Sequence, residues 1–174
     1  MGSQVTLYIA TSVDGYIADE NGDVDWLDEF EAGDSEGFDE FFERVDCLVM
    51  GATTYEQILG FDDWPYADKP TYVFTHRDLS PATDAVEFVD QPAGEVSRSL
   101  RQEHDRIWLV GGATLVQAFL GEHEIDEFRL FFVPILLGSG IPLFDGESDR
   151  QRLQLLDVAV RDSGIVEHHY EVGE

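Results

Sequence analysis

Apolar residues along the chain recur at two different spacings, and the change from one spacing to the other predicts strands that alternate with helices. Runs rich in β-branched and aromatic residues predict strands at 4–11, 46–51, 70–76, 85–89 and 106–111. Apolar residues three and four positions apart predict helices at 35–45, 53–60, 94–104 and 112–122. Repeated strand–helix–strand units imply parallel pairing through right-handed crossovers.

The C-terminal third has a different pattern. A long apolar run predicts one strand over 127–138, and residues 153–172 predict an antiparallel pair joined at Asp162-Ser163-Gly164. The 174 residues fit a single domain, 1–174, with no linker to divide it. We therefore expect an α/β fold with a mixed, mostly parallel sheet that ends in a C-terminal antiparallel hairpin.

Charge is the most unusual property of the composition. The chain has 37 acidic residues against 10 basic ones, and its net charge is −27. The acids are spread along the whole chain, which predicts an acidic, solvated surface and favours a salt-adapted source, because salt screens self-repulsion. The same charge argues against nucleic acid or an anionic membrane as a partner, because both require clustered lysine and arginine.

The single cysteine, Cys47, excludes an internal disulfide, and no signal peptide or membrane-spanning run is evident. A cytoplasmic protein is expected. No metal site is predicted: adjacent His168 and His169 on a strand point to opposite faces, and residues 19–30 lack the glycine and glutamate of a calcium loop.

The stretch "IWLVGGATLVQAFL" places Gly111 and Gly112 between a predicted strand and a predicted helix. Glycines let the backbone approach a phosphate closely, and the helix start supplies free N–H groups and a positive dipole end. Thr114 can add a hydroxyl. The alternative is a tight turn that needs glycine only for its dihedral angles.

A second stretch, "VMGATTYEQI", repeats this arrangement with Gly51, Thr53 and Thr54. Either threonine can cap the helix or contact a phosphate. Two such turns in one small sheet suit a dinucleotide. In "FTHR", residues Thr75, His76 and Arg77 follow another strand, and Arg77 suits a 2′-phosphate, although a solvated loop is an equal alternative.

Two further stretches are candidate walls of a cleft. The loop in "ATSVDGYIADENGDVDWL" can cover a site, with Asp14 as the best-placed carboxylate for substrate or proton handling. Capping of the turn before Gly15 is an equally good role for Asp14. In "PILLGSGIPLF", glycines interrupt an apolar strand, either to line a cleft or to form a bulge.

These motifs, in this order, resemble the dihydrofolate reductase-like superfamily, and more closely its riboflavin-biosynthesis reductase branch, the C-terminal domain of bifunctional deaminase-reductases and its stand-alone relatives. The blocks "SVDGYIA", "LVMGATTYEQI", "YVFTHR", "WLVGGATLVQAFL" and "IDEFRLFFVPILLGSGIPLF" span about residues 5–145. The resemblance implies a three-layer α/β/α fold and an NADPH-dependent reductase of a small heterocyclic substrate, an aminopyrimidine or a pterin-like ring, like the phosphoribosylaminouracil reductase of riboflavin biosynthesis.

The resemblance also implies site residues. The nicotinamide side would involve Ala10, Asn21 and Gly22. The pyrophosphate would contact the two glycine-bearing turns, at Gly51, Thr53, Thr54, Gly111, Gly112, Ala113, Thr114 and Leu115. The 2′-phosphate would contact Thr75, His76 or Arg77. The substrate ring would lie near Asp14, Trp26 and the helix 35–45.

Three features depart from the family patterns. Phe38 occupies the position of the buried carboxylate of dihydrofolate reductases, with Glu36 and Asp39 beside it. Val110 replaces the acidic residue that riboflavin-pathway reductases usually carry before the glycine pair, and no basic cluster for a ribose phosphate is evident.

Folate reduction and a non-catalytic nucleotide-binding relative therefore stay as alternatives to the aminopyrimidine reductase. The apolar run "LFFVPILL" suggests a homodimer surface, or else a central strand covered on both faces.

Overall fold

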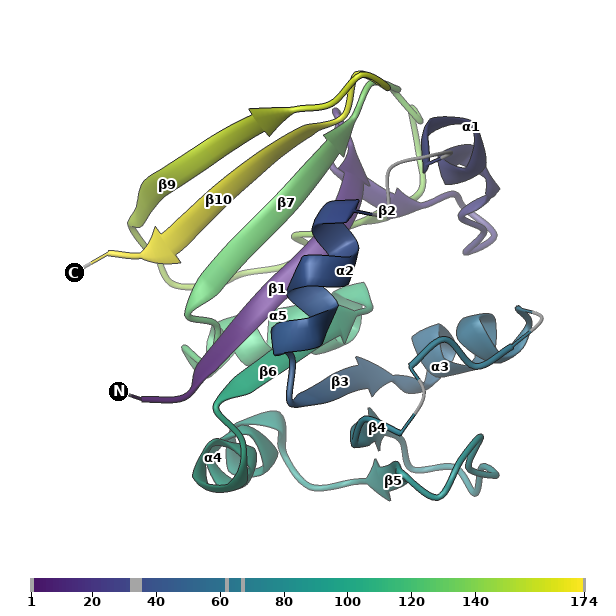
Figure 1. Cartoon of the computed structure of the whole chain (residues 1–174), viewed down its shortest axis with the longest axis vertical. Coiled ribbons are helices and arrows are strands. Elements are labelled where there is room, and N and C mark those ends of the chain that lie inside the picture. The colour runs from purple at the N-terminus through teal and green to yellow at the C-terminus, as the bar shows by residue number, and fades with distance from the viewer. Residues whose placement is uncertain (1, 32–35, 62, 67, 174) are drawn as a thin grey trace.

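A computed structural model describes residues 2–31, 36–61, 63–66 and 68–173 (Figure 1). The five N-terminal strands of the main sheet that were expected from sequence are present, as β1 (Gln4–Ser12), β3 (Cys47–Gly51), β4 (Thr71–Phe74), β5 (Val86–Val89) and β6 (Arg106–Gly111). The predicted helices are also present: α2 (Glu36–Arg44), α3 (Ala52–Leu59) and α4 (Ala93–Glu103) between these strands, and α5 (Ala113–Gly121) after β6.

One eight-stranded sheet organises the domain, in the order β5-β4-β3-β6-β1-β7-β10-β9. Neighbouring strands from β5 to β7 (Glu127–Val133) pair in parallel, whereas β10 (Val166–Val172) pairs antiparallel with both β7 and β9 (Leu153–Val160). The mixed sheet and its C-terminal hairpin confirm the predicted architecture.

Buried side chains lie on both faces of the sheet. On one face, Val116 and Phe119 of α5 and Leu100 of α4 pack against the strands. On the other face, Phe41 of α2 packs against Trp108, and Tyr55 of α3 belongs to the same buried cluster. Figure 1 shows α2 in front of the sheet and α5 behind it, which gives the three layers that the resemblance implied. Cys47 is fully buried, and burial raises the pKa of its thiol to about 12, as expected of a packed thiol.

Two predicted segments differ from the structure. The strand expected over 127–138 ends at Val133, because Pro134 has no N–H to donate to the ladder. The region expected to be one long loop contains β2 (Tyr16–Ala18), the short helix η1 (Asp25–Leu27) and α1 (Asp28–Glu31).

The strand β2 pairs antiparallel with β8 (Ile141–Pro142). Gly140 permits this pairing: its φ is +146°, and a Cβ there would lie 2.2 Å from the Ala18 carbonyl oxygen. The glycines of "GSG" therefore let this segment approach the backbone of β2.

Candidate active site

The two glycine-bearing turns lie side by side at the carboxyl ends of β3 and β6, which are adjacent parallel strands. Gly51 precedes α3 and Gly112 precedes α5, and neither helix start has a side-chain cap or an acid in its first turn. The first N–H groups of both helices thus have no helical acceptor and point, with the positive dipole ends, into the same region. Ligands bind most often at this edge of an α/β sheet.

The approach of the two turns is close. A Cβ at Gly112 would lie 3.2 Å from the Thr54 hydroxyl oxygen, and a Cβ at Gly51 would lie 3.9 Å from the Gly112 nitrogen. Gly111 has a φ of +131°, which side chains rarely adopt, and its peptide bond with Gly112 is cis. The backbone conformation at Gly111 therefore favours glycine, and a side chain at Gly112 would crowd the Thr54 hydroxyl.

A cleft of about 610 Å³ opens over these turns. Nine of the residues expected to contact a cofactor line it: Ala10, Gly22, Gly51, Thr53, Thr54, Gly112, Ala113, Thr114 and Leu115. No charged side chain is among the described residues of its lining. An anion in this cleft would therefore be held by backbone N–H groups and threonine hydroxyls.

Gln57 is a lining residue that the sequence did not single out. It lies on α3, one turn beyond Thr53 and Thr54, and its side-chain amide donates to the Gly22 carbonyl oxygen. The contact ties the loop after β2 to α3 across the cleft. A glutamine at helical spacing has no distinctive sequence signal, so only the fold reveals this bridge.

The residues Thr75, His76 and Arg77 lie beyond the cleft lining, which reaches β4 only at Phe74. Arg77 donates its backbone N–H to the Thr75 hydroxyl at 3.0 Å, and its guanidinium pairs with Glu56 of α3. The Arg77 side chain is 56% exposed. The positive charge therefore stands at the rim, beside the helix that carries Thr53 and Thr54.

A second cleft, of about 450 Å³, adjoins the first and shares Ile9, Ala10, Leu27 and Val110 with it. Its other walls are mainly aromatic, formed by Tyr8, Phe38, Trp108 and Phe131. Phe38, from α2, faces this cleft, whereas Asp39 is exposed and the Glu36 side chain lies outside the described residues. Among the described lining residues there is no carboxylate.

Among the described lining residues of this apolar cleft, Arg161 carries a charge. It follows β9, and its guanidinium lies 5.5 Å from the Phe131 ring centroid and 3.5 Å from Glu167. The Glu167 side chain is only 8% exposed and accepts from Arg129 at 2.7 Å. This buried carboxylate, held by Arg129, fixes one side of the Arg161 guanidinium. Arg161 is more than 120 residues from Phe38 in the sequence, so no local pattern could predict that they share a cleft.

Asp14 lies away from both clefts. Its carboxylate accepts from the Ser12 hydroxyl at 2.6 Å and from the Gly138 backbone at 2.8 Å, and a further bond comes from Leu137. The hydroxyl bond of Ser12, with those backbone bonds, lowers the pKa of Asp14. These contacts agree with the alternative role of Asp14, which is to stabilise the turn before Gly15. A role of Asp14 in substrate chemistry stays a prediction.

Trp26 and Asn21 also do not line either cleft. Trp26 packs with Phe131 and Ile165, two residues that line the aromatic cleft. Asn21 is exposed and donates its backbone N–H to Asp19. Both residues belong to the segment that carries Gly22 and Leu27 to the clefts, so their contribution would be to place that segment.

A family model described as the RibD C-terminal domain matches residues 3–167. The chain belongs to this family. YwjB of Bacillus subtilis (strain 168), an uncharacterized protein, is 42% identical over 157 residues, which cover 89% of this chain and 90% of YwjB. The resemblance seen in the ordered motifs is thus confirmed.

Solved structures agree with this assignment. A putative riboflavin biosynthesis protein from Shewanella sp. PV-4 superposes with a TM-score of 0.88 at 32% identity, and each chain covers 100% of the other. A Thermotoga maritima deaminase/reductase shares the fold at 18% identity, with a TM-score of 0.73, and is matched over 57% of its length. None of the described helices is long and apolar enough to cross a membrane.

Proposed function

We propose that the chain is an NADPH-dependent reductase of a small heterocyclic substrate. The observation that carries the proposal is the pair of adjoining clefts, one bounded by two uncapped helix starts and the other by aromatic rings. A dinucleotide in the first cleft and a flat ring in the second would meet at the shared wall of Ile9, Ala10 and Val110. NADPH, when bound, supplies the hydride.

The cofactor cleft suits a dinucleotide in two respects. A side chain at Gly112 would crowd the Thr54 hydroxyl, so glycine lets the two turns lie close together, and it leaves the backbone at the start of α5 accessible to a phosphate in the cleft. The helix starts supply positive potential without lysine, which matters in a chain of net charge −27. The N–H groups of Ala113, Thr114 and Leu115 would hold the pyrophosphate, with Thr53 and Thr54 opposite.

The preference for the phosphorylated cofactor would rest on Arg77. Its guanidinium is at the rim and already pairs with a carboxylate, Glu56, in the geometry that a 2′-phosphate could replace. Thr75 and His76 stand beside it. In this proposal Gln57 holds the Gly22 loop over the cleft and limits the access of water.

The substrate side favours a flat heterocyclic ring with a hydrogen-bond acceptor or an anionic group. Tyr8, Phe38 and Trp108 offer aromatic contact, and Arg161 offers a charge-assisted donor at the cleft wall. This combination supports a compound related to 5-amino-6-(5-phosphoribosylamino)uracil, after which the Thermotoga maritima reductase is named. Folate reduction has less support, because the described lining contains no carboxylate to protonate a pterin.

The test has two parts, both in molar KCl. NADPH is first expected to raise the melting temperature, and NADPH oxidation is then measured with a panel of aminopyrimidines and pterins. Turnover of an aminopyrimidine supports the proposal, and turnover of dihydrofolate favours the folate alternative. Binding without any turnover favours a non-catalytic relative, whereas a melting temperature unchanged by NADPH contradicts the cofactor assignment.

A further inference from the structure

Reduction of a C=N bond needs a proton as well as a hydride, because the nitrogen that receives the bonding electron pair must be protonated. The aromatic cleft offers few groups that could supply this proton. Eight of its eleven described lining residues have hydrocarbon side chains. The other three, Tyr8, Trp108 and Arg161, carry a side-chain O–H or N–H group.

Two of these three groups cannot give up a proton. The Trp108 indole acts as a hydrogen-bond donor only, and it donates to the Tyr8 carbonyl oxygen at 3.1 Å. The Arg161 guanidinium stays protonated in a protein. A phenol can both donate a hydrogen bond and transfer its proton, so the Tyr8 hydroxyl is the candidate acid among the described lining side chains.

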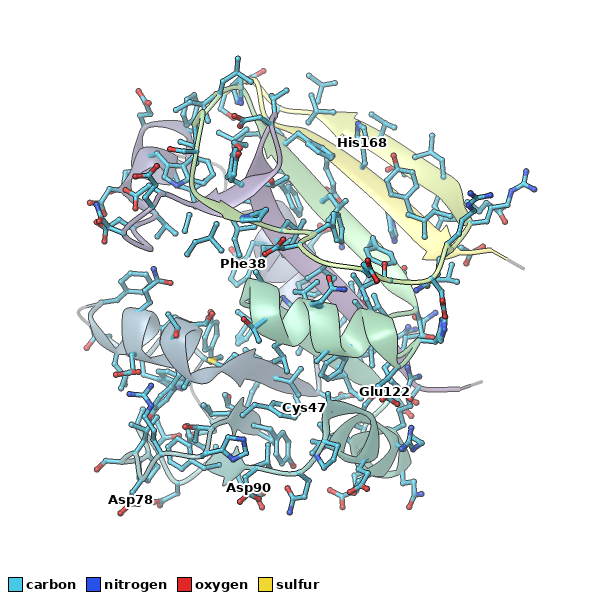
Figure 2. The ribbon with its side chains drawn as sticks, turned by 180° about the vertical axis from the view of Figure 1, so that it is seen from behind. Phe38, Cys47, Asp78, Asp90, Glu122 and His168 are labelled. Carbon is cyan, nitrogen blue, oxygen red and sulfur yellow. The ribbon has the colours of Figure 1, made fainter. Side chains whose placement is uncertain are left out.

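Tyr8 lies on the strand that forms part of the wall shared by the two clefts. It precedes Ala10 by two residues on β1, so both side chains project from the same face of the sheet, roughly 7 Å apart along the strand. Ala10 lines both clefts, where the two rings would meet. In Figure 2, which views the molecule from behind, Phe38 of α2 lies beyond the sheet, and its ring centroid is 6.1 Å from that of Tyr8. Tyr8 is therefore on the substrate side of the shared wall.

Aromatic neighbours hold the Tyr8 ring in place. Phe41 stacks on it, with ring centroids 4.1 Å apart and 12° between the ring planes. The Phe131 ring lies 4.5 Å away, centroid to centroid, and the Trp108 ring 5.9 Å away. A ring packed in this way loses little further freedom when a substrate binds, so its hydroxyl is already oriented for transfer.

Positive charge stands close to the same ring. Arg129 and Tyr8 are paired residues of β7 and β1, and the guanidinium carbon of Arg129 lies 5.2 Å from the Tyr8 ring centroid. Glu167 accepts from Arg129 at 2.7 Å and also lies 3.5 Å from Arg161. Two guanidinium groups thus share one carboxylate, which leaves a net positive charge beside Tyr8. That charge would stabilise the phenolate formed when the proton leaves.

We propose that Tyr8 is the acid that protonates the substrate, an inference that rests on the proposed reductase function. Tyr8 gives its hydroxyl proton to the nitrogen of a C=N bond whose carbon receives the hydride. The π electron pair of that bond forms the new N–H bond, the O–H bond of Tyr8 breaks, and the phenolate regains a proton from water. Asp14, the carboxylate that the sequence suggested for proton handling, lines neither cleft.

The test replaces single hydroxyl groups and keeps the rings. Tyr8→Phe is compared with Tyr72→Phe, the matched control, because the Tyr72 hydroxyl lies 3.4 Å from His104 and Tyr72 lines neither cleft. Thermal melting in molar KCl checks that both variants fold. Tyr8→Phe is expected to lower kcat for the aminopyrimidine that the wild type reduces by about 10²- to 10⁴-fold, and to leave the Kd for NADPH unchanged. Tyr72→Phe should change neither.

A second readout needs no cofactor. Isothermal titration calorimetry measures the Kd of the same aminopyrimidine for the protein without NADPH. Loss of the hydrogen bond from Tyr8 should raise this Kd by about 2- to 12-fold, a much smaller effect than the loss in kcat, because proton transfer occurs only in the transition state.

The outcomes separate this inference from the reductase proposal. A folded Tyr8→Phe chain that keeps the kcat of the Tyr72→Phe control would overturn the role of Tyr8 and leave the reductase in place. So would equal losses in kcat for both variants, because the effect would then not belong to the cleft. A wild-type chain that binds NADPH and reduces no substrate would contradict the reductase itself, and with it proton transfer by Tyr8.

Discussion

Replacement of Gly112 by alanine tests the close approach of the two turns. The φ and ψ of Gly112 are −89° and −158°, which alanine adopts without strain, so the substitution changes space and not backbone conformation. The added Cβ would lie 3.2 Å from the Thr54 hydroxyl, inside normal contact distance, and would crowd the turn that is proposed to bind a phosphate. The expected result is a folded protein with weakened NADPH binding.

The size of the loss follows from the hydrogen bonds at the start of α5. A phosphate displaced by the methyl group would lose at least one bond from the N–H groups at Ala113–Leu115, and a hydrogen bond to a charged group contributes about 1.5–3 kcal/mol. One lost bond corresponds to a roughly 10- to 150-fold increase in the Kd for NADPH. Isothermal titration calorimetry in molar KCl measures this directly.

Gly121→Ala is the matched control, because Gly121 ends the same helix and a Cβ there would meet nothing within 4 Å. Its Kd should equal that of the wild type. If Gly112→Ala binds NADPH as tightly as the control does, the phosphate does not lie between these turns and the assignment of the cofactor cleft is wrong.

Four further results are expected. Arg77→Gln should weaken NADPH binding about tenfold and leave NADH binding unchanged, because a 2′-phosphate contact is lost; equal losses for both cofactors would refute that role. Arg161→Gln should raise the KM for the substrate about tenfold without a change in NADPH affinity, whereas exposed Arg150→Gln should change neither. Asp14→Asn should lower the melting temperature at neutral pH. Because the Asp14 pKa is lowered, its carboxylate stabilises the fold above the ordinary value of 3.8, and the difference should disappear as the pH falls through the lowered pKa; a difference independent of pH would argue against the bracing bonds. The melting temperature of the wild type should rise steeply with KCl, because the Debye length falls to about 3 Å at 1 M salt; insensitivity to salt would contradict an adaptive role for the acids.

The fold could be predicted because its strands and helices have strong local periodicity and alternate in order. The same holds for the two glycine-bearing turns, since Gly51 and Gly112 stand at the junction of a buried strand and an apolar helix. Parallel pairing then places both turns at one edge of the sheet. The order and direction of the strands are therefore enough to predict where these two turns meet.

The features of the site that the sequence did not predict depend on tertiary contacts, which leave no local pattern in the sequence. Arg161 reaches the aromatic cleft because the hairpin of β9 and β10 folds beside β7, and Glu167 holds it there. Gln57 meets Gly22 across the cleft. Asp14 was predicted as a catalytic candidate on its position in a loop, yet backbone donors 123 and 124 residues away determine what its carboxylate contacts.

The central claim is that a dinucleotide and a heterocyclic ring occupy the adjoining clefts in contact. The most direct measurement is deuteride transfer: NADPH that carries deuterium at one nicotinamide position is incubated with an aminopyrimidine substrate in molar KCl, and the product is analysed by mass spectrometry. Deuterium in the product from one of the two NADPH epimers, and not from the other, is the predicted result, because the shared wall at Ile9, Ala10 and Val110 would present one nicotinamide face to the ring. Tight NADPH binding with no deuterium in any product of the substrate panel would contradict the claim.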